Sequence, residues 1–244
     1  MAKKADVIRL IENFAPLETV EEWDNSGFQV NLHQEEVNKI LLALNVSEKI
    51  VSQAISQRCD MIISHHPLIF SPLKKIEEPF VVEAIKNNIQ IYSAHTNLDK
   101  ATGGTTDKLI KKLGYKNAKS FNEFIKTVEL DEPITVCEVA ARVKNALGIP
   151  FIKATGDINK RVKQIAFGAG SCGSFIPDFK NSNIELFITG EVKYHEALES
   201  KDIAVFDLGH FYSEKYVTEI FKNILEKLNL EIVIADEEDI WHFV

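Results

Sequence analysis

The chain has 244 residues, of which 45% are hydrophobic and 26% are charged, a composition typical of globular proteins that excludes a largely disordered chain. Folding a chain of this length buries a sizeable core, in one large domain or two smaller ones. The formal net charge of -8 argues against broad electrostatic binding to nucleic acid, because such binding depends on clustered Lys and Arg. We therefore expect no nucleic-acid partner.

The predicted elements of the first half alternate between helices and short apolar strands. Helices are predicted over 7–14, 48–57, 80–87 and 105–113, and strands over 39–44, 60–63 and 89–93. Ser47 is the expected N-cap of the second helix, and Gly114 is expected to end the fourth.

The second half shows a similar rhythm of elements. Strands are predicted over 124–130, 151–155, 162–167, 184–188, 203–207 and 231–234, and helices over 135–147, 193–200 and 212–228. This alternation is typical of an α/β fold with a largely parallel or mixed sheet.

The cysteine pattern and the lack of long apolar runs indicate a protein of the reducing cytoplasm. Cys59, Cys137 and Cys172 form no CxxC pair and are odd in number, so neither a disulfide framework nor a thiolate zinc site is indicated. The N-terminal segment has no apolar signal core, and no stretch approaches the ~20 apolar residues of a membrane span. We therefore expect a cytoplasmic protein with no membrane partner.

Two adjacent histidines, His65 and His66, follow an apolar strand and precede Pro67. Neighbouring residues on a strand point to opposite faces, so both imidazoles can serve one cluster only where the strand has ended. Pro67 restricts His66 to extended or polyproline conformations and prevents a helix from starting through the pair. The two rings can then splay toward two different ions, which favours a two-metal centre.

Two further segments place potential ligands just after predicted strands, where α/β sheets usually assemble their sites. One runs from His95 to Asp99, and the other holds His210 and Glu214, four residues apart on one face of a helix start. Imidazole and carboxylate groups without thiolates suit Zn²⁺, Mn²⁺, Fe²⁺, Co²⁺ or Ni²⁺. A carboxylate such as Asp99 or Glu214 could bridge two ions roughly 3.5–4 Å apart, a spacing that activates water.

Each of these residues also has an ordinary structural interpretation. His95 could hydrogen-bond within a turn, Asp99 could cap the next segment, and a His–Glu pair at this spacing is common on solvated helices. The coincidence of three strand-end segments favours a metal site. By contrast, His33 and His242 lie outside such contexts and are expected on the surface.

Five segments resemble, in the same order, motifs of the Ngg-interacting-factor-like family, whose bacterial members are often called GTP cyclohydrolase 1 type 2 homologues. They are Trp23-Asp24-Asn25-Ser26-Gly27, Ser64-His65-His66-Pro67-Leu68-Ile69-Phe70, Ala94-His95-Thr96-Asn97-Leu98-Asp99, Thr189-Gly190-Glu191, and Gly209-His210 with Glu214. The resemblance extends from Glu22 to Glu214, nearly the whole chain.

The resemblance implies a dinuclear centre of two divalent ions. Its ligands carry over onto His65, His66, Asp99, His210 and Glu214. It also implies two intertwined α/β units of similar organisation, with mixed sheets flanked by helices. We place the unit with the metal site at residues 1–120 plus 205–244 and the second unit at 121–204. The resemblance further implies a toroidal homohexamer whose metal sites face an internal cavity.

His95 and Glu191 are the catalytic candidates outside the ligand set. His95 could orient Asp99, hold substrate or donate a proton, and Glu191 could serve as a proton donor from another element.

Two further segments each allow either a structural or a ligand-binding interpretation. The segment from Trp23 to Gly27 is either a turn with Trp23 in the core or a substrate contact. The segment from Gly168 to Gly173 is either a phosphate cradle of backbone N–H groups or a tight turn, and Cys172 within it is expected to be structural.

The leading functional interpretation is a metal-dependent hydrolase that uses a metal-activated water on a small molecule. The family name suggests a nucleotide, GTP, as the substrate, although a dinuclear centre is equally competent for phosphoester or other C–N hydrolysis. The alternative is a metal-binding regulatory or interaction module without turnover.

Overall fold

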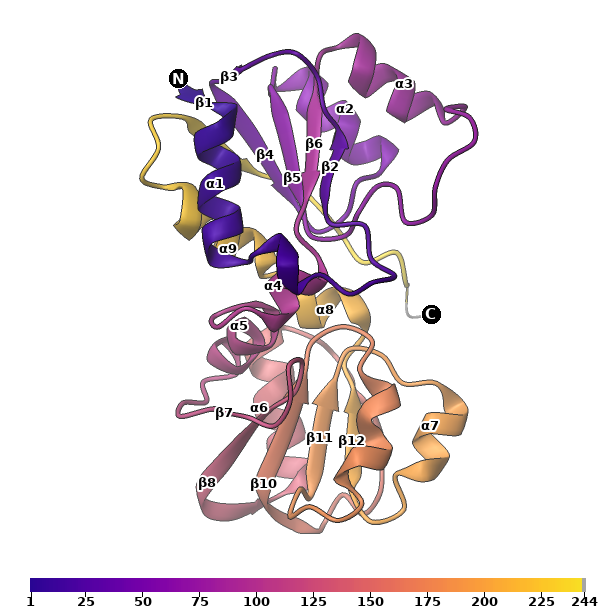
Figure 1. The fold of residues 1–244 in the computed structure, drawn as a ribbon. Helices are drawn as coiled ribbons and strands as arrows, with labels where there is room; N and C mark the ends of the chain where they lie inside the picture. Colours follow the sequence, from indigo (N-terminus) through magenta and orange to yellow (C-terminus); the bar gives the residue numbers. More distant parts are fainter. Residues whose placement is uncertain (243–244) are drawn as a thin grey trace. The chain divides into compact units, whose positions relative to one another are not determined.

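Residues 1–104 and 217–238 form one α/β unit of the chain, and residues 105–216, together with residues 239–242, form a second. These units are seen in a computed structural model that describes residues 1–242. The chain enters the second unit, returns to the first and leaves it again, and each unit has its own mixed sheet flanked by helices (Figure 1). The predicted fold class is confirmed.

The sheet of the first unit has five strands, and its three central strands are buried, with apolar residues at most positions of two of them and the polar Gln90 and Ser93 at the ends of the third. Its order is β13 (Glu231–Ile234), β4 (Lys39–Ala43), β5 (Met61–Ser64), β6 (Gln90–Ser93) and β2 (Gly27–Val30). All neighbours are parallel except β2, which is antiparallel to β6. The carboxyl ends of β4, β5 and β6 therefore lie at one edge of the sheet.

Helices cover both faces of this sheet (Figure 1). One pair is α2 (Glu48–Ser56) and α3 (Pro79–Lys86), which pack on Leu41, Ile62 and Ile91, and the other is α1 (Lys4–Phe14) and α9 (Val217–Leu225). The Ser47 side chain caps α2 by accepting a hydrogen bond from the Ile50 N–H, as predicted. The shorter elements of this unit are β1 (Ala2–Lys3), η1 (Leu17–Thr19), β3 (Glu36–Val37) and α4 (Thr96–Lys100).

The sheet of the second unit has six strands around a parallel centre. Its order is β7 (Lys119–Ser120), β8 (Lys126–Thr135), β10 (Arg161–Gly168), β11 (Leu186–Thr189), β12 (Ala204–Asp207) and β9 (Lys153–Thr155). Strands β10, β11 and β12 are parallel, and the other pairs are antiparallel. The helical elements of this unit are α5 (Thr105–Lys112), α6 (Val136–Leu147), η2 (Gly173–Phe179), α7 (Tyr194–Glu199) and α8 (His210–Glu214).

The observed units differ from the predicted boundaries at α5, β7, α8 and most of β12, which the prediction assigns to the first unit. Helix α5 contacts both α8 and β10. The Thr106 hydroxyl donates to the Phe124 carbonyl and accepts from the Ala169 N–H, which fixes α5 within the second unit. His210 and Glu214 therefore belong to the second unit.

The helix predicted over 212–228 is two helices, α8 and α9, and the prediction of one helix is wrong. Tyr212 and Tyr216 pack on the core of the second unit, whereas α9 packs on α1 and β4 of the first. Both segments keep a helical spacing of apolar residues, so periodicity did not reveal that they cover different cores.

All three cysteines lie among the described residues and none is in a disulfide; Cys59 and Cys172 are buried and Cys137 is exposed. Within residues 1–242, no helix has both the length and the apolar character needed to cross a bilayer.

Candidate metal centre

Three histidines of the first unit follow the carboxyl ends of neighbouring parallel strands. His65 and His66 come directly after β5, and His95 comes two residues after β6. The backbone N–H groups of His65 and His66 still donate to the carbonyls of Ala43 and Leu44, so the β4–β5 ladder holds the pair in place. The imidazoles therefore lie where the sheet ends, as predicted.

Each of these rings is held through Nδ1 by an oxygen. The His65 Nδ1 lies 2.8 Å from the Ala94 carbonyl, the His66 Nδ1 lies 2.7 Å from Asn45 Oδ1, and the His95 Nδ1 lies 2.8 Å from Asp24 Oδ1. A carbonyl or carboxylate oxygen only accepts, so Nδ1 carries the hydrogen. In the neutral ring this leaves the lone pair on Nε2, the tautomer that binds a metal.

The three rings form a compact group. Their centroids are 5.0 Å apart for His65 and His66, 5.2 Å for His65 and His95, and 5.4 Å for His66 and His95. One ligand atom from each lies within 4.8 Å of the others. Asp99 adds a carboxylate, with Oδ1 3.4 Å from His65 Nε2. This set of nitrogen and oxygen donors fits a divalent transition metal.

Asp24 is a buried carboxylate that sequence reasoning did not assign to the site. Besides His95, it accepts hydrogen bonds from the Thr96 N–H at 3.1 Å, the Thr96 hydroxyl at 2.6 Å and the Ser26 hydroxyl at 3.0 Å. Burial alone would raise the pKa of Asp24, but the hydrogen bonds from His95 and Thr96 and the charge of His95 hold it well below its usual range. Asp24 is therefore an anion that orients His95.

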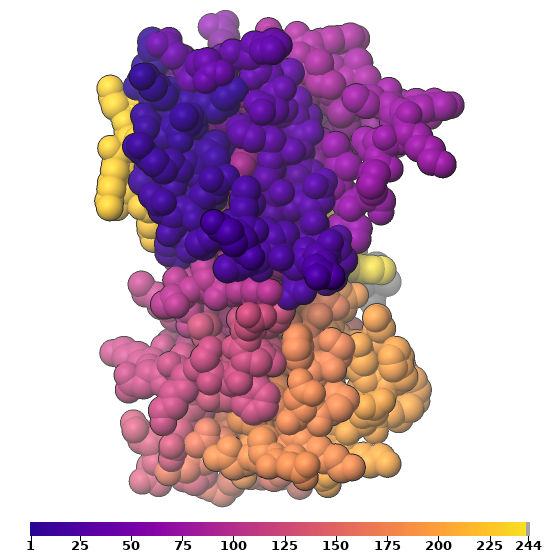
Figure 2. Space-filling model, viewed as in Figure 1, coloured from indigo at the N-terminus to yellow at the C-terminus, as the bar shows by residue number. Residues whose placement is uncertain are grey.

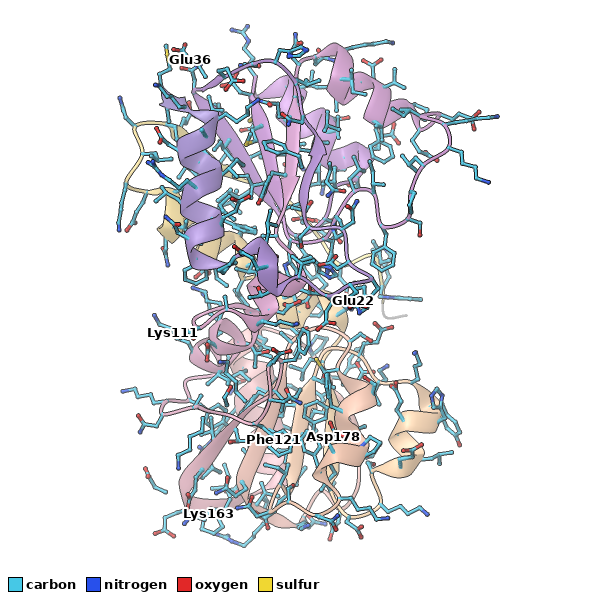
Figure 3. The ribbon with its side chains drawn as sticks, in the orientation of Figure 1. Glu22, Glu36, Lys111, Phe121, Lys163 and Asp178 are labelled. Atoms are coloured by element: carbon cyan, nitrogen blue, oxygen red, sulfur yellow. The ribbon has the colours of Figure 1, made fainter. Side chains whose placement is uncertain are left out.

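The segment from Trp23 to Gly27 is neither a core segment nor a simple turn. Figure 3 labels Glu22, the residue directly before it. The Ser26 hydroxyl accepts from the His95 N–H at 3.0 Å, so the segment binds both the ring and the backbone of His95. The Trp23 side chain is 58% exposed, so the interpretation that places it in the core is wrong.

In the second unit, α8 places His210 beside Glu214, one turn apart on the same face. His210 Nε2 lies 2.9 Å from Glu214 Oε2, and His210 Nδ1 lies 3.2 Å from Glu191 Oε2. Burial works to lower the pKa of His210, but the hydrogen bonds and charges of Glu214 and Glu191 outweigh it and raise the pKa to about 9. Without a metal the imidazole is therefore charged at neutral pH, and a metal would have to displace its proton.

The glycine-rich loop after β10 makes room for Glu214. A Cβ on Gly170 would lie 2.2 Å from Glu214 Oε1, and the backbone of Gly170 has φ +71°. The N–H groups of Ala169, Gly170 and Cys172 already donate to the hydroxyls of Thr106, Ser213 and Thr189. These N–H groups face protein acceptors, so the loop does not form a phosphate cradle with them.

Comparison with known proteins identifies relatives along nearly the whole chain. The family model described as Duf34/NIF3 (NGG1p interacting factor 3) matches residues 2–239. The chain is 32% identical to the GTP cyclohydrolase 1 type 2 homolog of Clostridium perfringens, over 99% of this chain and 100% of that protein. It is also 32% identical to NIF3-like protein 1 of Drosophila melanogaster, over 97% of this chain and 86% of that protein.

A solved structure shares the fold. A Bacillus cereus protein related to NIF3 superposes with a TM-score of 0.90 at 22% identity, covering 100% of this chain and 99% of that one.

Replacing Asp24 tests its role as a charged anchor. Because its pKa is lowered by folding, Asp24 stabilises the protein above its ordinary pKa of about 4, and this contribution is lost as pH falls below that value. Asp24→Asn should lower the free energy of unfolding by about 1–3 kcal/mol at neutral pH, with a smaller difference in acid. Urea unfolding of both proteins across pH measures this, and a difference independent of pH would contradict it.

Gly170→Ala should displace the Glu214 carboxylate, because the new methyl group and that oxygen cannot occupy the same space. Gly114→Ala is a matched control in the same unit, since Gly114 has φ +82° but no atom within 4 Å of the added Cβ. Both variants strain the backbone, and only Gly170→Ala should also lower the metal bound per chain, measured by mass spectrometry. Equal metal content in the two variants would exclude this role for Gly170.

Proposed function

The chain belongs to the Duf34/NIF3 family, and we propose that it is a hydrolase that depends on two divalent metal ions per chain. The proposed ligands are His65, His66, Asp99, His210 and Glu214. The observation that carries the proposal is the orientation of His65 and His66, each fixed through Nδ1, so that Nε2 is the ring nitrogen that would coordinate a metal. The motifs shared with the family support the same five residues.

The donor set supports catalysis over a purely structural role. Two ions with five protein ligands keep open coordination positions, which water and substrate can occupy. When bound, the ions would lower the pKa of a water and polarise the bond under attack. The protein supplies imidazole and carboxylate donors without thiolates, which suits Zn²⁺, Mn²⁺, Fe²⁺, Co²⁺ or Ni²⁺.

His95 is the proposed acid–base residue. Its Nδ1–H is held by Asp24, so Nε2 is the ring atom that exchanges a proton with substrate. The contact between its Nδ1 and the carboxylate of Asp24 keeps the imidazole in one orientation. Glu191 is the second candidate, and its contact with His210 Nδ1 favours a role in orienting that ligand.

We propose a nucleotide, with GTP as the first candidate, as the substrate because relatives are named GTP cyclohydrolase 1 type 2 homologs. Opening the purine ring at C8 with loss of formate breaks two C8–N bonds, so it consumes two waters and delivers a proton to each departing nitrogen. His95 would take a proton from the attacking water at Nε2 and pass it to the departing nitrogen.

A metal-binding regulatory or interaction module is the second candidate. The description of the matching family as an interacting factor favours it. In such a module the metal would support folding or partner binding, and all its coordination positions would be closed by protein atoms.

The proposal extends to assembly and location. The family resemblance supports a toroidal homohexamer in the cytoplasm. Light scattering should give a mass of six chains, and a monomer under native conditions would exclude that assembly.

His66→Ala should lower both the bound metal and GTP hydrolysis by at least tenfold while leaving the α/β fold intact, because it removes one ligand nitrogen. His33→Ala is the matched control, because His33 is an exposed histidine of the same unit. Metal is measured per chain by mass spectrometry, formate release by assay, and the fold by circular dichroism.

Three outcomes separate the candidates. Loss of metal and turnover together supports the hydrolase. Full metal with no turnover of GTP or a panel of phosphoesters by the wild-type protein favours the module. Unfolding of His66→Ala assigns the metal a structural role.

A further inference from the structure

Two large aromatic side chains lie beside the histidine group of the first unit and remain open to solvent. Trp23 and Phe70 are 58% and 55% exposed, with ring centroids 5.9 Å apart and a tilt of 42° between the ring planes. The edge of Trp23 also meets His95, at 6.1 Å and an interplanar angle of 79°. Phe70 lies on the segment between β5 and α3 that projects from the first unit (Figure 2).

The two aromatic residues stand on backbone segments that are tied together. The Asn25 side chain donates to the Ile69 carbonyl at 2.5 Å, and the Ile69 N–H donates to Gln29 Oε1 at 3.0 Å. Gln29 in turn donates to the Asn25 carbonyl at 2.6 Å. Trp23 directly precedes Asp24, and Asp24 contacts the ring of His95. The backbone segments that carry Trp23 and Phe70 are therefore connected to His95, the residue proposed to transfer the proton.

An ordered Trp–Phe pair contributes little to the core while it is more than half exposed, so burial does not account for its position. Aromatic rings held open beside a few oriented polar groups are typical of sites that bind flat ligands. A heteroaromatic ring presents an apolar face to such side chains and polar atoms at its edge. His95 is such a polar group, because its ring is oriented by Asp24 and lies with its centroid 6.1 Å from that of Trp23.

We propose that Trp23 and Phe70 form a stacking platform for the nucleobase of the substrate, which presents the base to His95. The proposal deepens the proposed function and rests on it for the identity of the substrate. The platform recognises the flat ring and not the phosphates, because its two side chains carry no charge. Binding of the base should therefore depend on Trp23 whether or not turnover follows.

The chain offers a direct optical test because its two tryptophans are Trp23 and Trp241. Trp241→Phe leaves Trp23 as the single tryptophan, which is excited selectively over the tyrosines, and Trp23→Phe leaves Trp241, which is 72% exposed. Each variant is titrated with GTP, guanosine, ribose 5-phosphate and tripolyphosphate. GTP and guanosine should quench Trp23 with saturation, and the two probes without a base should not. None of the four should quench Trp241 with saturation.

Calorimetry measures the contribution to affinity. Trp23→Ala should weaken GTP binding about tenfold, within the range for stacking of one base, and Phe70→Ala should weaken it less. Trp241→Ala is the matched control and should bind GTP as the wild-type protein does. Because Trp23 and Phe70 are exposed, circular dichroism should find both alanine variants folded.

The outcomes distinguish this proposal from the proposed function. Turnover of GTP with unchanged affinity in Trp23→Ala would overturn the platform and keep the hydrolase. Saturable quenching by guanosine without turnover of GTP or of the phosphoester panel would support the platform and contradict the hydrolase. Equal quenching by probes with and without a base would overturn the platform. So would a Trp23→Ala variant whose only change is in self-association.

Discussion

The structure of the site depends on the hydrogen bonds that hold three histidines through Nδ1. A backbone carbonyl, an amide oxygen and a buried carboxylate fix the rings of His65, His66 and His95. Each bond places the ring hydrogen on Nδ1 and fixes the ring orientation, so Nε2 is the nitrogen through which His65 and His66 would bind metal and His95 would exchange a proton. The parallel strands β5 and β6 bring these rings to one edge of the sheet, and the hydrogen bonds decide what the rings can do there.

The second unit uses carboxylates for the same purpose. Glu214 and Glu191 hold the two nitrogens of His210, and their charge outweighs burial, so the ring is protonated near neutral pH. Loading a metal on His210 must therefore release a proton, which makes metal affinity depend on pH. Gly170 has a steric role here, since any side chain at that position would occupy the space of the Glu214 carboxylate.

Local patterns in the sequence predicted most strands and helices, and the position of His65 and His66 at a strand end, but they missed the short strands β1, β2, β3 and β7. They also predicted that His210 and Glu214 share a helix face, because that spacing is set by helix geometry alone. Asp24 could not be found in this way, because it lies 71 residues before His95 and only the fold brings the two together. Trp23 was equally ambiguous, since a tryptophan has the same apolar character in a core as in an exposed stacking position. The glycine-rich loop after β10 resembled an anion cradle because sequence does not reveal which hydroxyls occupy its N–H groups.

The central claim is that His65 and His66 bind metal through Nε2 in a catalytic centre with two divalent ions. Its most direct test is anomalous X-ray scattering from crystals of protein purified without chelator, collected at the absorption edge of the bound metal. The account predicts two ion peaks per chain, with His65 Nε2 and His66 Nε2 about 2.0–2.2 Å from metal, as for imidazole ligands of Zn²⁺. Metal-saturated crystals with no ion at these two nitrogens, or with coordination through Nδ1, would contradict it.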